Sequence, residues 1–160
     1  MPANTQKAVL RLLSSGLYVL TTQHGDQIAA ATVSWLTQVS FEPPLVMVAL
    51  RQESRIHDLT RAGGRFGVNV LGQDQQEIAQ AFFKPARVEP GTLSGYAYRP
   101  GQEECPILVD VPAWFECRVV EVHAGQGDHT LFIGLVTATG LAPDAGPTLA
   151  LRDTPWSYGG

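Results

Sequence analysis

The sequence predicts one all-β domain: an antiparallel barrel of about six strands, with short helices packed outside it. Sixteen glycines and eleven prolines make the chain rich in turns, which suits an all-β architecture better than a helical bundle. The expected order of elements is a helix, several strands, two short helices and then further strands. That order lacks the βαβ alternation of a doubly wound sheet. With no repeat, low-complexity tract or linker, residues 1–160 are expected to form a single domain.

The first forty residues predict a helix followed by two strands. Asn4 is expected to cap the helix and Gly16 to end it. Residues 17–23 predict a strand, and residues 24–27 (HGDQ) have the chemistry of a hairpin turn. Residues 28–39 then predict one long strand that leads into a loop.

The middle of the chain predicts one buried strand, another strand and two short helices. Residues 45–50 form a continuous apolar run after two prolines, and we expect this strand to be buried on both faces. Ser54 is expected to cap a helix that ends at residues 63–64 (GG). A strand over residues 66–71 follows. Asp74, with Glu77 three residues later, then predicts a capping box at the start of the second helix.

The last part of the chain predicts a long loop and two long strands. Residues 84–104 are expected to form a surface excursion, a length typical of functional or mobile loops. Residues 113–123 alternate at first and then slip phase at residues 119–120, which predicts a bulge or burial on both faces. A turn over residues 125–128 and a strand over residues 129–139 complete the pattern.

The composition points to an oligomer and excludes several functional classes. Charged residues make up 16% of the chain, against about 25% in an average soluble domain. A chain so poor in charge, with strands that are apolar on both faces, is expected to hide surface against a second subunit. A net charge of −4 argues against nucleic acid and anionic membranes as partners. No apolar stretch approaches the roughly 20 residues of a membrane span, and no signal peptide is recognisable, so we expect a cytoplasmic protein.

Standard catalytic and metal-binding signatures are absent from the sequence. It holds no nucleophile elbow, no HExxH, no P-loop and no GxGxxG after a strand. Cys105 and Cys117 form no CxxC pair. The four histidines, at positions 24, 57, 123 and 129, show no metal-ligand spacing. A metal site is therefore not expected.

Three segments remain as candidates for ligand binding. Residues 30–40 are rich in hydroxyls and small side chains, which lets a phosphate or a heterocycle approach the backbone, although a hydroxyl-bearing strand edge is the commoner explanation. His129 opens a strand at a turn and can donate to a ligand, or it can simply be satisfied by that turn. Ser54 and Arg55 place a hydroxyl and a cation at a helix N-terminus, a ready anion site, although most such caps bind nothing.

Taken together, these segments resemble the flavin reductase-like family, the FMN-binding split barrels that include the reductase components of two-component flavin monooxygenases. Each segment is weak alone, but six in the family's order are specific, and the resemblance covers about residues 15–151. The segments are 16–22 (GLYVLTT), 32–44 (TVSWLTQVSFEPP), 66–71 (FGVNVL), 106–108 (PIL), 113–117 (AWFEC) and 127–130 (GDHT). The resemblance implies a six-stranded antiparallel split β-barrel of the FMN-binding type, with short flanking helices, working as a homodimer.

The resemblance also implies a set of cofactor-binding residues. Those along the flavin ring and ribityl chain would be Thr32, Val33, Ser34 and Trp35. Those at its pyrimidine or ribityl side would be Gln38, Val39 and Ser40. Those holding the phosphate would be Leu50, Arg51, Ser54 and Arg55. Phe82 and His129 would approach the ring from the far side or from the partner subunit, where nicotinamide must stack. Trp156 would replace the family's usual aromatic-basic ending, which is missing from the tail.

The activity implied is hydride transfer from NADH or NADPH to FMN, with FAD as a second candidate flavin. The cofactor carries this chemistry, so the protein supplies stacking geometry and electrostatics. Donors near the flavin atoms that gain charge on reduction would favour the reduced state, and His129 is the catalytic candidate for that role. The reduced flavin would be delivered to a partner oxygenase.

Two other functions remain open at this point. The chain can be a non-enzymatic flavoprotein that holds FMN as an electron carrier or sensor and has no nicotinamide site. The same barrel can also hold another ligand, such as a deazaflavin, haem or pyridoxal phosphate. The sequence decides neither NADH against NADPH nor whether the flavin is a prosthetic group or a substrate.

Overall fold

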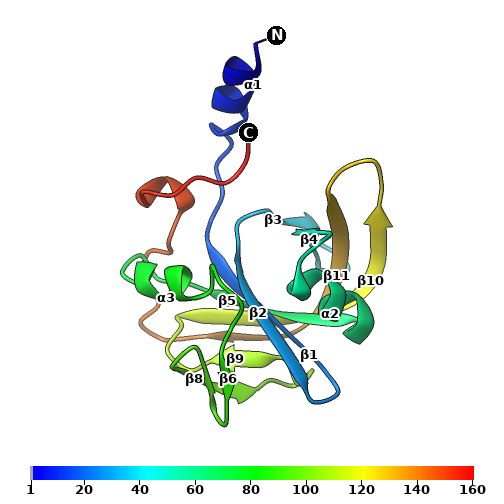
Figure 1. Ribbon diagram of the computed structural model, residues 1–160. Coiled ribbons are helices and arrows are strands. Elements are labelled where there is room, and N and C mark those ends of the chain that lie inside the picture. Colours follow the sequence, from blue (N-terminus) through cyan, green and yellow to red (C-terminus); the bar gives the residue numbers. More distant parts are fainter. Residues whose placement is uncertain (1) are drawn as a thin grey trace.

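The computed structural model describes residues 2–160, and its main layer is a seven-stranded antiparallel sheet. Figure 1 shows this sheet curling around the interior. In spatial order its strands are β2 (Gln27–Val33), β1 (Tyr18–His24), β5 (Arg65–Val70), β10 (Ala113–Ala124), β11 (His129–Leu141), β4 (Leu45–Arg51) and β3 (Leu36–Ser40). The expected all-β fold with short helices is confirmed, and β2 and β3 form the two ends of the sheet, which agrees with a split barrel.

The strand count is seven in this sheet because the expected long strand over residues 28–39 is two strands. β2 ends at Val33 and β3 begins at Leu36, and the two belong to opposite ends of the sheet. The expectation of one continuous strand was therefore wrong. The break at Ser34 and Trp35 takes the chain from one end of the sheet to the other, and it places both residues in a connection that faces a cavity.

Two local predictions for the strands are confirmed and one is wrong in part. Gly25, with φ of 61°, turns β1 into β2, so the expected hairpin is present. The pairing of β10 with β11 shifts register between Val119 and Glu121, which leaves Val120 as the expected bulge. β4 alternates between buried and half-buried residues, so it is not fully buried on both faces.

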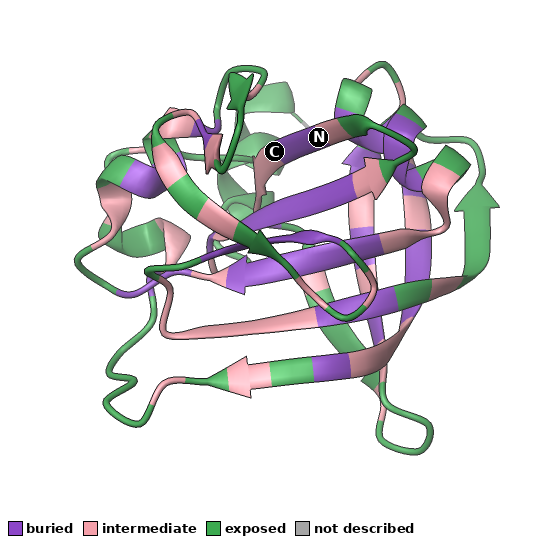
Figure 2. Cartoon of the chain, turned by 90° about the horizontal axis from the view of Figure 1, so that it is seen from below, coloured by how far each residue is buried: buried purple, intermediate pink, exposed green. Residues whose placement is uncertain are grey.

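The core consists of two clusters of buried apolar side chains, which lie on the two faces of the sheet at β1. One cluster contains Leu20, Val48, Phe66 and Phe132, and the other contains Val19 with side chains from α3 and the C-terminal part of the chain. Successive residues of β1 point to opposite faces, so Val19 and Leu20 enter different clusters. Figure 2 shows the buried residues concentrated along the central parts of the strands.

Helix α2 (Arg55–Gly63) matches the sequence prediction at both ends. The Ser54 hydroxyl accepts a hydrogen bond from the His57 backbone N–H at 3.2 Å, and Gly64 adopts a left-handed conformation with φ of 69°. The His57 ring is buried and is bonded to Thr130 Oγ1 at 2.8 Å. The start of α2 is therefore fixed against β11, where the chain leaves β4.

The other two helices begin elsewhere than predicted. Asn4 lies inside α1 (Ala3–Leu10), whose N-cap is Pro2, and this helix ends well before Gly16. α3 (Gln76–Ala81) is preceded by Gln75, so the capping box expected at Asp74 does not form. Gln75 instead accepts from the Gly72 N–H and donates to the Asp110 carbonyl, which uses its side chain to tie two loops together.

Residues 84–104 lie mostly at the surface, as expected, but they are not an irregular loop, so that part of the expectation was wrong. They contain β6 (Val88–Glu89), β7 (Thr92–Leu93) and β8 (Tyr96–Pro100), which form a second antiparallel sheet with β9 (Pro106–Leu108). The strands are too short to show a two-residue periodicity in the sequence. Leu93 and the whole of β9 are buried, so this small sheet covers one side of the main sheet.

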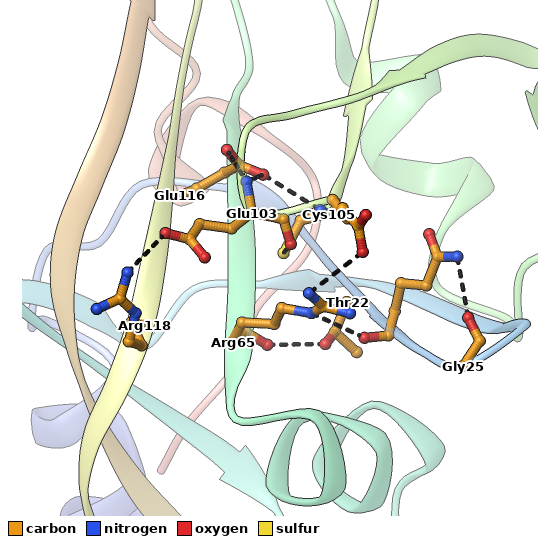
Figure 3. A network of polar contacts seen from close by, with 9 residues as sticks. Thr22, Gly25, Arg65, Glu103, Cys105, Glu116 and Arg118 are labelled. Atoms are coloured by element: carbon orange, nitrogen blue, oxygen red, sulfur yellow. Dashed lines mark hydrogen bonds and ion pairs between the residues drawn. The ribbon is translucent and has the colours of Figure 1, made fainter.

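A buried carboxylate fixes the turn that leads into β9. Glu116 on β10 is fully buried and accepts from the Glu103 backbone N–H at 3.1 and 3.0 Å and from the Cys105 N–H at 3.1 Å. Figure 3 shows this carboxylate with Arg118, which pairs with Glu103 at 3.1 Å. The three backbone contacts compensate for removing the charge from water.

The N-terminal helix α1 extends away from the sheet in Figure 1, and none of its residues is buried. Four apolar side chains in and just after it are exposed, and they are Val9, Leu10, Leu12 and Leu13. Within residues 2–160, no helix is both long and apolar enough to span a membrane.

Candidate functional site

One cavity collects most of the residues that the sequence singled out. Its volume is about 450 Å³, within the range of small-molecule sites. Its walls come from four places: the end of β2 with the connection to β3, the end of β4 with the start of α2, the residues after α3, and the C-terminal segment (residues 154–160). The lining residues include Thr32, Val33, Ser34, Trp35, Leu50, Arg51, Ser54, Phe82, Phe83, Trp156, Ser157 and Tyr158.

The β2–β3 connection is held rigidly by hydrogen bonds to its neighbours. Thr32 donates through its backbone N–H to the Phe82 carbonyl at 3.1 Å and through Oγ1 to the Ala79 carbonyl at 2.6 Å. On the other side of the connection, the Trp35 carbonyl accepts from the Ala49 N–H at 3.0 Å. The Thr32 hydroxyl is thus used within the fold, and it joins the β2 wall of the cavity to α3.

Ser34 is different, because its hydroxyl is left without a partner. The residue is only 5% exposed, it lines the cavity, and its Oγ has no hydrogen-bond partner among the described residues. A buried hydroxyl without a partner costs about 1–3 kcal/mol. Such an atom in a cavity wall fits a polar ligand that supplies the missing hydrogen bond.

Another part of the cavity wall carries a positive charge and a helix start. The Ser54 hydroxyl donates to the Arg51 carbonyl at 2.7 Å, which turns the end of β4 directly into α2. Arg51 lines the cavity with an exposed side chain. A guanidinium beside the N–H groups of a first helical turn is suited to an anion such as a phosphate.

His129 lies behind the cavity wall, with both ring nitrogens engaged. Nδ1 lies 2.7 Å from Asp128 Oδ1, and Nε2 lies 2.7 Å from Tyr158 Oη. This contact and the charge of His129 lower the pKa of the Asp128 carboxyl. Because the carboxylate only accepts, Nδ1 carries the hydrogen, and in the neutral ring the Tyr158 O–H donates to Nε2.

The C-terminal segment forms an aromatic wall. Tyr158 meets Trp35 edge-on, with ring centroids 4.9 Å apart, and Trp35 in turn lies 4.6 Å from the His129 ring. Trp156 packs edge-on against Phe83 at 4.7 Å. Burial raises the pKa of the Tyr158 hydroxyl above its ordinary value, so the hydroxyl stays protonated at neutral pH.

Not all of the expected site residues reach the cavity. Nine line it: Thr32, Val33, Ser34, Trp35, Leu50, Arg51, Ser54, Phe82 and Trp156. The other five are Gln38, Val39 and Ser40 on β3, Arg55 at the start of α2, and His129, and none of them is among its lining residues. The Gln38 amide donates to the Ser40 carbonyl at 3.1 Å within β3, and Gln38 also lines a separate shallow groove.

Sequence reasoning missed Phe83, Ser157 and Tyr158. Phe83 follows Phe82 at the end of α3, and only the three-dimensional arrangement shows that both reach the cavity. The sequence does offer one signal for Tyr158, since it is an aromatic residue in a turn-rich tail. Nothing near it in the sequence, however, predicts its contact with His129.

The residues present fit a flavin mononucleotide. The aromatic side chains of Trp35, Phe82 and Trp156 suit a planar ring, and the Ser34 hydroxyl offers a polar contact at its edge. Arg51 and the start of α2 suit a phosphate. Among residues 2–160, no group of three or more His, Cys, Asp or Glu side chains is placed to hold a metal ion.

Comparison with known proteins matches one family model and several flavin reductases. The family model described as "Flavin reductase like domain" matches residues 10–155. The chain is 38% identical over 144 residues to the NADH-dependent flavin reductase StyB of Pseudomonas fluorescens, covering 87% of this chain and 78% of that protein. It is 37% identical over 107 residues to a probable flavin reductase of Rhizobium meliloti, covering 67% of this chain but only 33% of that longer protein.

Solved structures agree with the sequence comparison. The styrene monooxygenase flavin reductase SMOB of Pseudomonas putida S12 superposes with a TM-score of 0.76 at 37% identity, covering 92% of this chain and 91% of that one.

Proposed function

Because the chain belongs to the flavin reductase like family, we propose that it is an enzyme that transfers hydride from a dihydronicotinamide nucleotide to a flavin. The observation that carries this proposal is the unpartnered Ser34 hydroxyl in a cavity that has aromatic walls and a cation at one end. A flavin supplies the redox chemistry itself, accepting hydride at its ring when bound.

The chain's own residues bind and orient the two substrates. We place the phosphate of FMN at Arg51 and the first turn of α2, and the ring along the residues between Thr32 and Trp35. In this arrangement Ser34 donates a hydrogen bond at the ring edge, and the aromatic residues exclude water from the reacting faces. FMN, rather than FAD, is the flavin we favour, because the cavity volume of about 450 Å³ suits a mononucleotide.

His129 takes a positioning role in this proposal. Its ring is held between Asp128 and Tyr158, so it orients the Tyr158 hydroxyl in the cavity wall. Arg55 lies between the lining residues Ser54 and Ile56, whereas Gln38, Val39 and Ser40 lie farther along β3. We place their flavin contacts on the backbone or at the cavity rim.

We further propose that the reduced flavin is released to a partner oxygenase in the cytoplasm, and that the chain works as a homodimer. Phe41 is 91% exposed and Leu141 is 77% exposed, and each flanks a shallow groove that Trp114 and Phe115 line. An apolar surface of this kind is typical of an interface. Sedimentation velocity should give a dimer, and Phe41→Asp should shift it toward monomer. A monomeric wild type would contradict this part of the proposal.

The enzymatic proposal is tested by anaerobic spectroscopy of the purified protein mixed with FMN. Addition of NADH or NADPH should bleach the flavin absorption in a reaction that depends on enzyme concentration. Repeating the titration with FAD and with riboflavin measures the choice of flavin. If the flavin binds but stays oxidised with both nicotinamide nucleotides, the protein is a flavin carrier or sensor, and the reductase proposal is wrong.

A further inference from the structure

The C-terminal segment, residues 154–160, forms one wall of the cavity and is held there by several separate contacts. At its beginning the Thr154 hydroxyl donates to the Leu151 carbonyl at 2.7 Å, and Trp156 packs against Phe83. At its end the Tyr158 hydroxyl reaches His129 at 2.7 Å, and Arg11 Nε donates to the Gly159 carbonyl at 3.2 Å. The far end is thus attached to two distant parts of the chain.

The cavity under this segment is large enough for one ligand. Its volume of about 450 Å³ lies near the lower end of the range for single small-molecule sites. Hydride transfer needs two stacked rings, one from the flavin and one from the nicotinamide. The C-terminal segment supplies Trp156, Ser157 and Tyr158 to the wall. Residues 156–160 belong to no helix or strand, so no ladder of backbone hydrogen bonds fixes this wall as it fixes the strands.

We propose that the C-terminal segment is a strap that regulates access of the nicotinamide nucleotide, and that the Tyr158–His129 hydrogen bond is its latch. The inference rests on the proposed reductase function, since it assigns a second substrate to the same cavity. In the closed state Tyr158 Oη is hydrogen-bonded to His129 Nε2, while the ring of Tyr158 packs edge-on against Trp35. The nicotinamide nucleotide binds only the open state. Its apparent Kd is therefore its intrinsic Kd divided by the fraction of molecules that are open, and the latch raises it by lowering that fraction.

Asp128 fixes which nitrogen of the His129 ring accepts the hydrogen bond of the latch. Its carboxylate accepts the Nδ1 hydrogen of His129 and leaves Nε2 as the acceptor for the Tyr158 hydroxyl in the neutral ring. Arg11 is an independent second anchor, located just after α1 and exposed on the surface. Removal of either anchor should favour the open state.

The kinetic test uses Tyr158→Phe, which removes the hydroxyl and keeps the ring. Loss of one neutral hydrogen bond corresponds to about a 2- to 13-fold change in an equilibrium constant. We expect KM for NADH to fall by a factor in this range while kcat is unchanged or higher. Arg11→Met should act in the same direction. Tyr98→Phe, the same chemical change on β8 and outside the cavity lining, is the matched control and should change neither constant.

The second readout does not depend on catalysis. Chymotrypsin cleaves after aromatic residues, so cleavage after Trp156 and residue 158 reports how often the segment opens, and Phe at position 158 is still a cleavage site. In protein without flavin, Tyr158→Phe should be cleaved faster than wild type by a factor similar to the fall in KM. Saturating NAD⁺ on the flavin-loaded wild type should also accelerate cleavage, because the ligand and the open state favour each other.

The possible outcomes separate this inference from the proposed function. If wild type oxidises NADH but Tyr158→Phe raises KM and leaves the cleavage rate unchanged, Tyr158 is a substrate contact and the strap is refuted. If wild type oxidises neither NADH nor NADPH with any flavin, the reductase proposal fails. In that case faster cleavage of Tyr158→Phe would still support the latch, and an unchanged rate would refute it.

Discussion

Replacing Ser34 by alanine should make the protein more stable and its flavin binding weaker. The Ser34 hydroxyl is buried without a partner, at a cost of about 1–3 kcal/mol to the folded state. Alanine removes that cost and loses little packing, so we expect a gain of about 1 kcal/mol in the free energy of unfolding. For a domain of this size, such a gain raises the midpoint of thermal unfolding by about 2–4 °C. The bound flavin loses one hydrogen bond, so Kd should rise about 2- to 13-fold.

A second unpartnered hydroxyl provides the control for this prediction. Thr60 in α2 is fully buried, and its Oγ1 also lacks a partner among the described residues, but Thr60 does not line the cavity. Thr60→Val removes the hydroxyl at nearly constant shape, so it should stabilise the protein without changing flavin affinity. Thermal unfolding of the flavin-free protein and titration of FMN fluorescence measure the two quantities. If Ser34→Ala leaves the FMN affinity unchanged, or lowers the stability, the assignment of Ser34 to the ligand is refuted.

Three further predictions concern charge and ionisation. Arg51→Ala should weaken FMN binding by about tenfold or more, as expected for loss of a charge-assisted contact, and leave riboflavin binding unchanged; equal losses for both flavins would contradict the phosphate assignment. Glu116→Gln should lower the free energy of unfolding by about 2–4 kcal/mol in urea titrations, because an amide replaces a carboxylate held by backbone N–H groups, whereas the exposed Glu121→Gln should change it by less than about 0.5 kcal/mol. Burial, followed by the charge of Glu116, raises the pKa of the Cys105 and Cys117 thiols from 9.0 to about 12. In the native protein at pH 8 both should therefore resist iodoacetamide. Unfolded thiols ionise first as the pH rises, so stability should fall between pH 9.0 and about 12, and native labelling at pH 8 would show that a thiol is accessible.

The sequence predicts this fold best where the signal is local. The Ser54 cap, the left-handed Gly64 and the bulge at Val120 depend on residues within a few positions of one another, and the structure has all three. Asn4 and Asp74 carry similar capping signals but do not cap, because Pro2 and Gln75 occupy the first positions instead. Propensity at a helix start indicates several neighbouring candidates, and these two helices begin one or two positions from the predicted cap.

The second sheet shows why other elements are hidden in the sequence. β6 and β7 have two residues each, which is too short for any alternation between buried and exposed positions. Their place in the fold depends instead on pairing with one another and with β8. Pairing of this kind is set by contacts between segments, so a periodicity argument finds only a polar stretch rich in glycine and proline.

The cavity has the same division between local and distant contacts. Nine of the fourteen expected residues line the cavity, and seven of these lie in two short runs, residues 32–35 and 50–54, which a resemblance of motifs can locate. The C-terminal wall is held by contacts that no motif predicts: Arg11 meets Gly159 across 148 positions, and Tyr158 meets His129 across 29. His129 is conspicuous in the sequence because it opens a strand at a turn, yet its ring faces a tyrosine from the chain's end. The chemistry assigned to that histidine therefore depends on whether the C-terminal segment is closed, and a pattern read along the chain contains no information about that state.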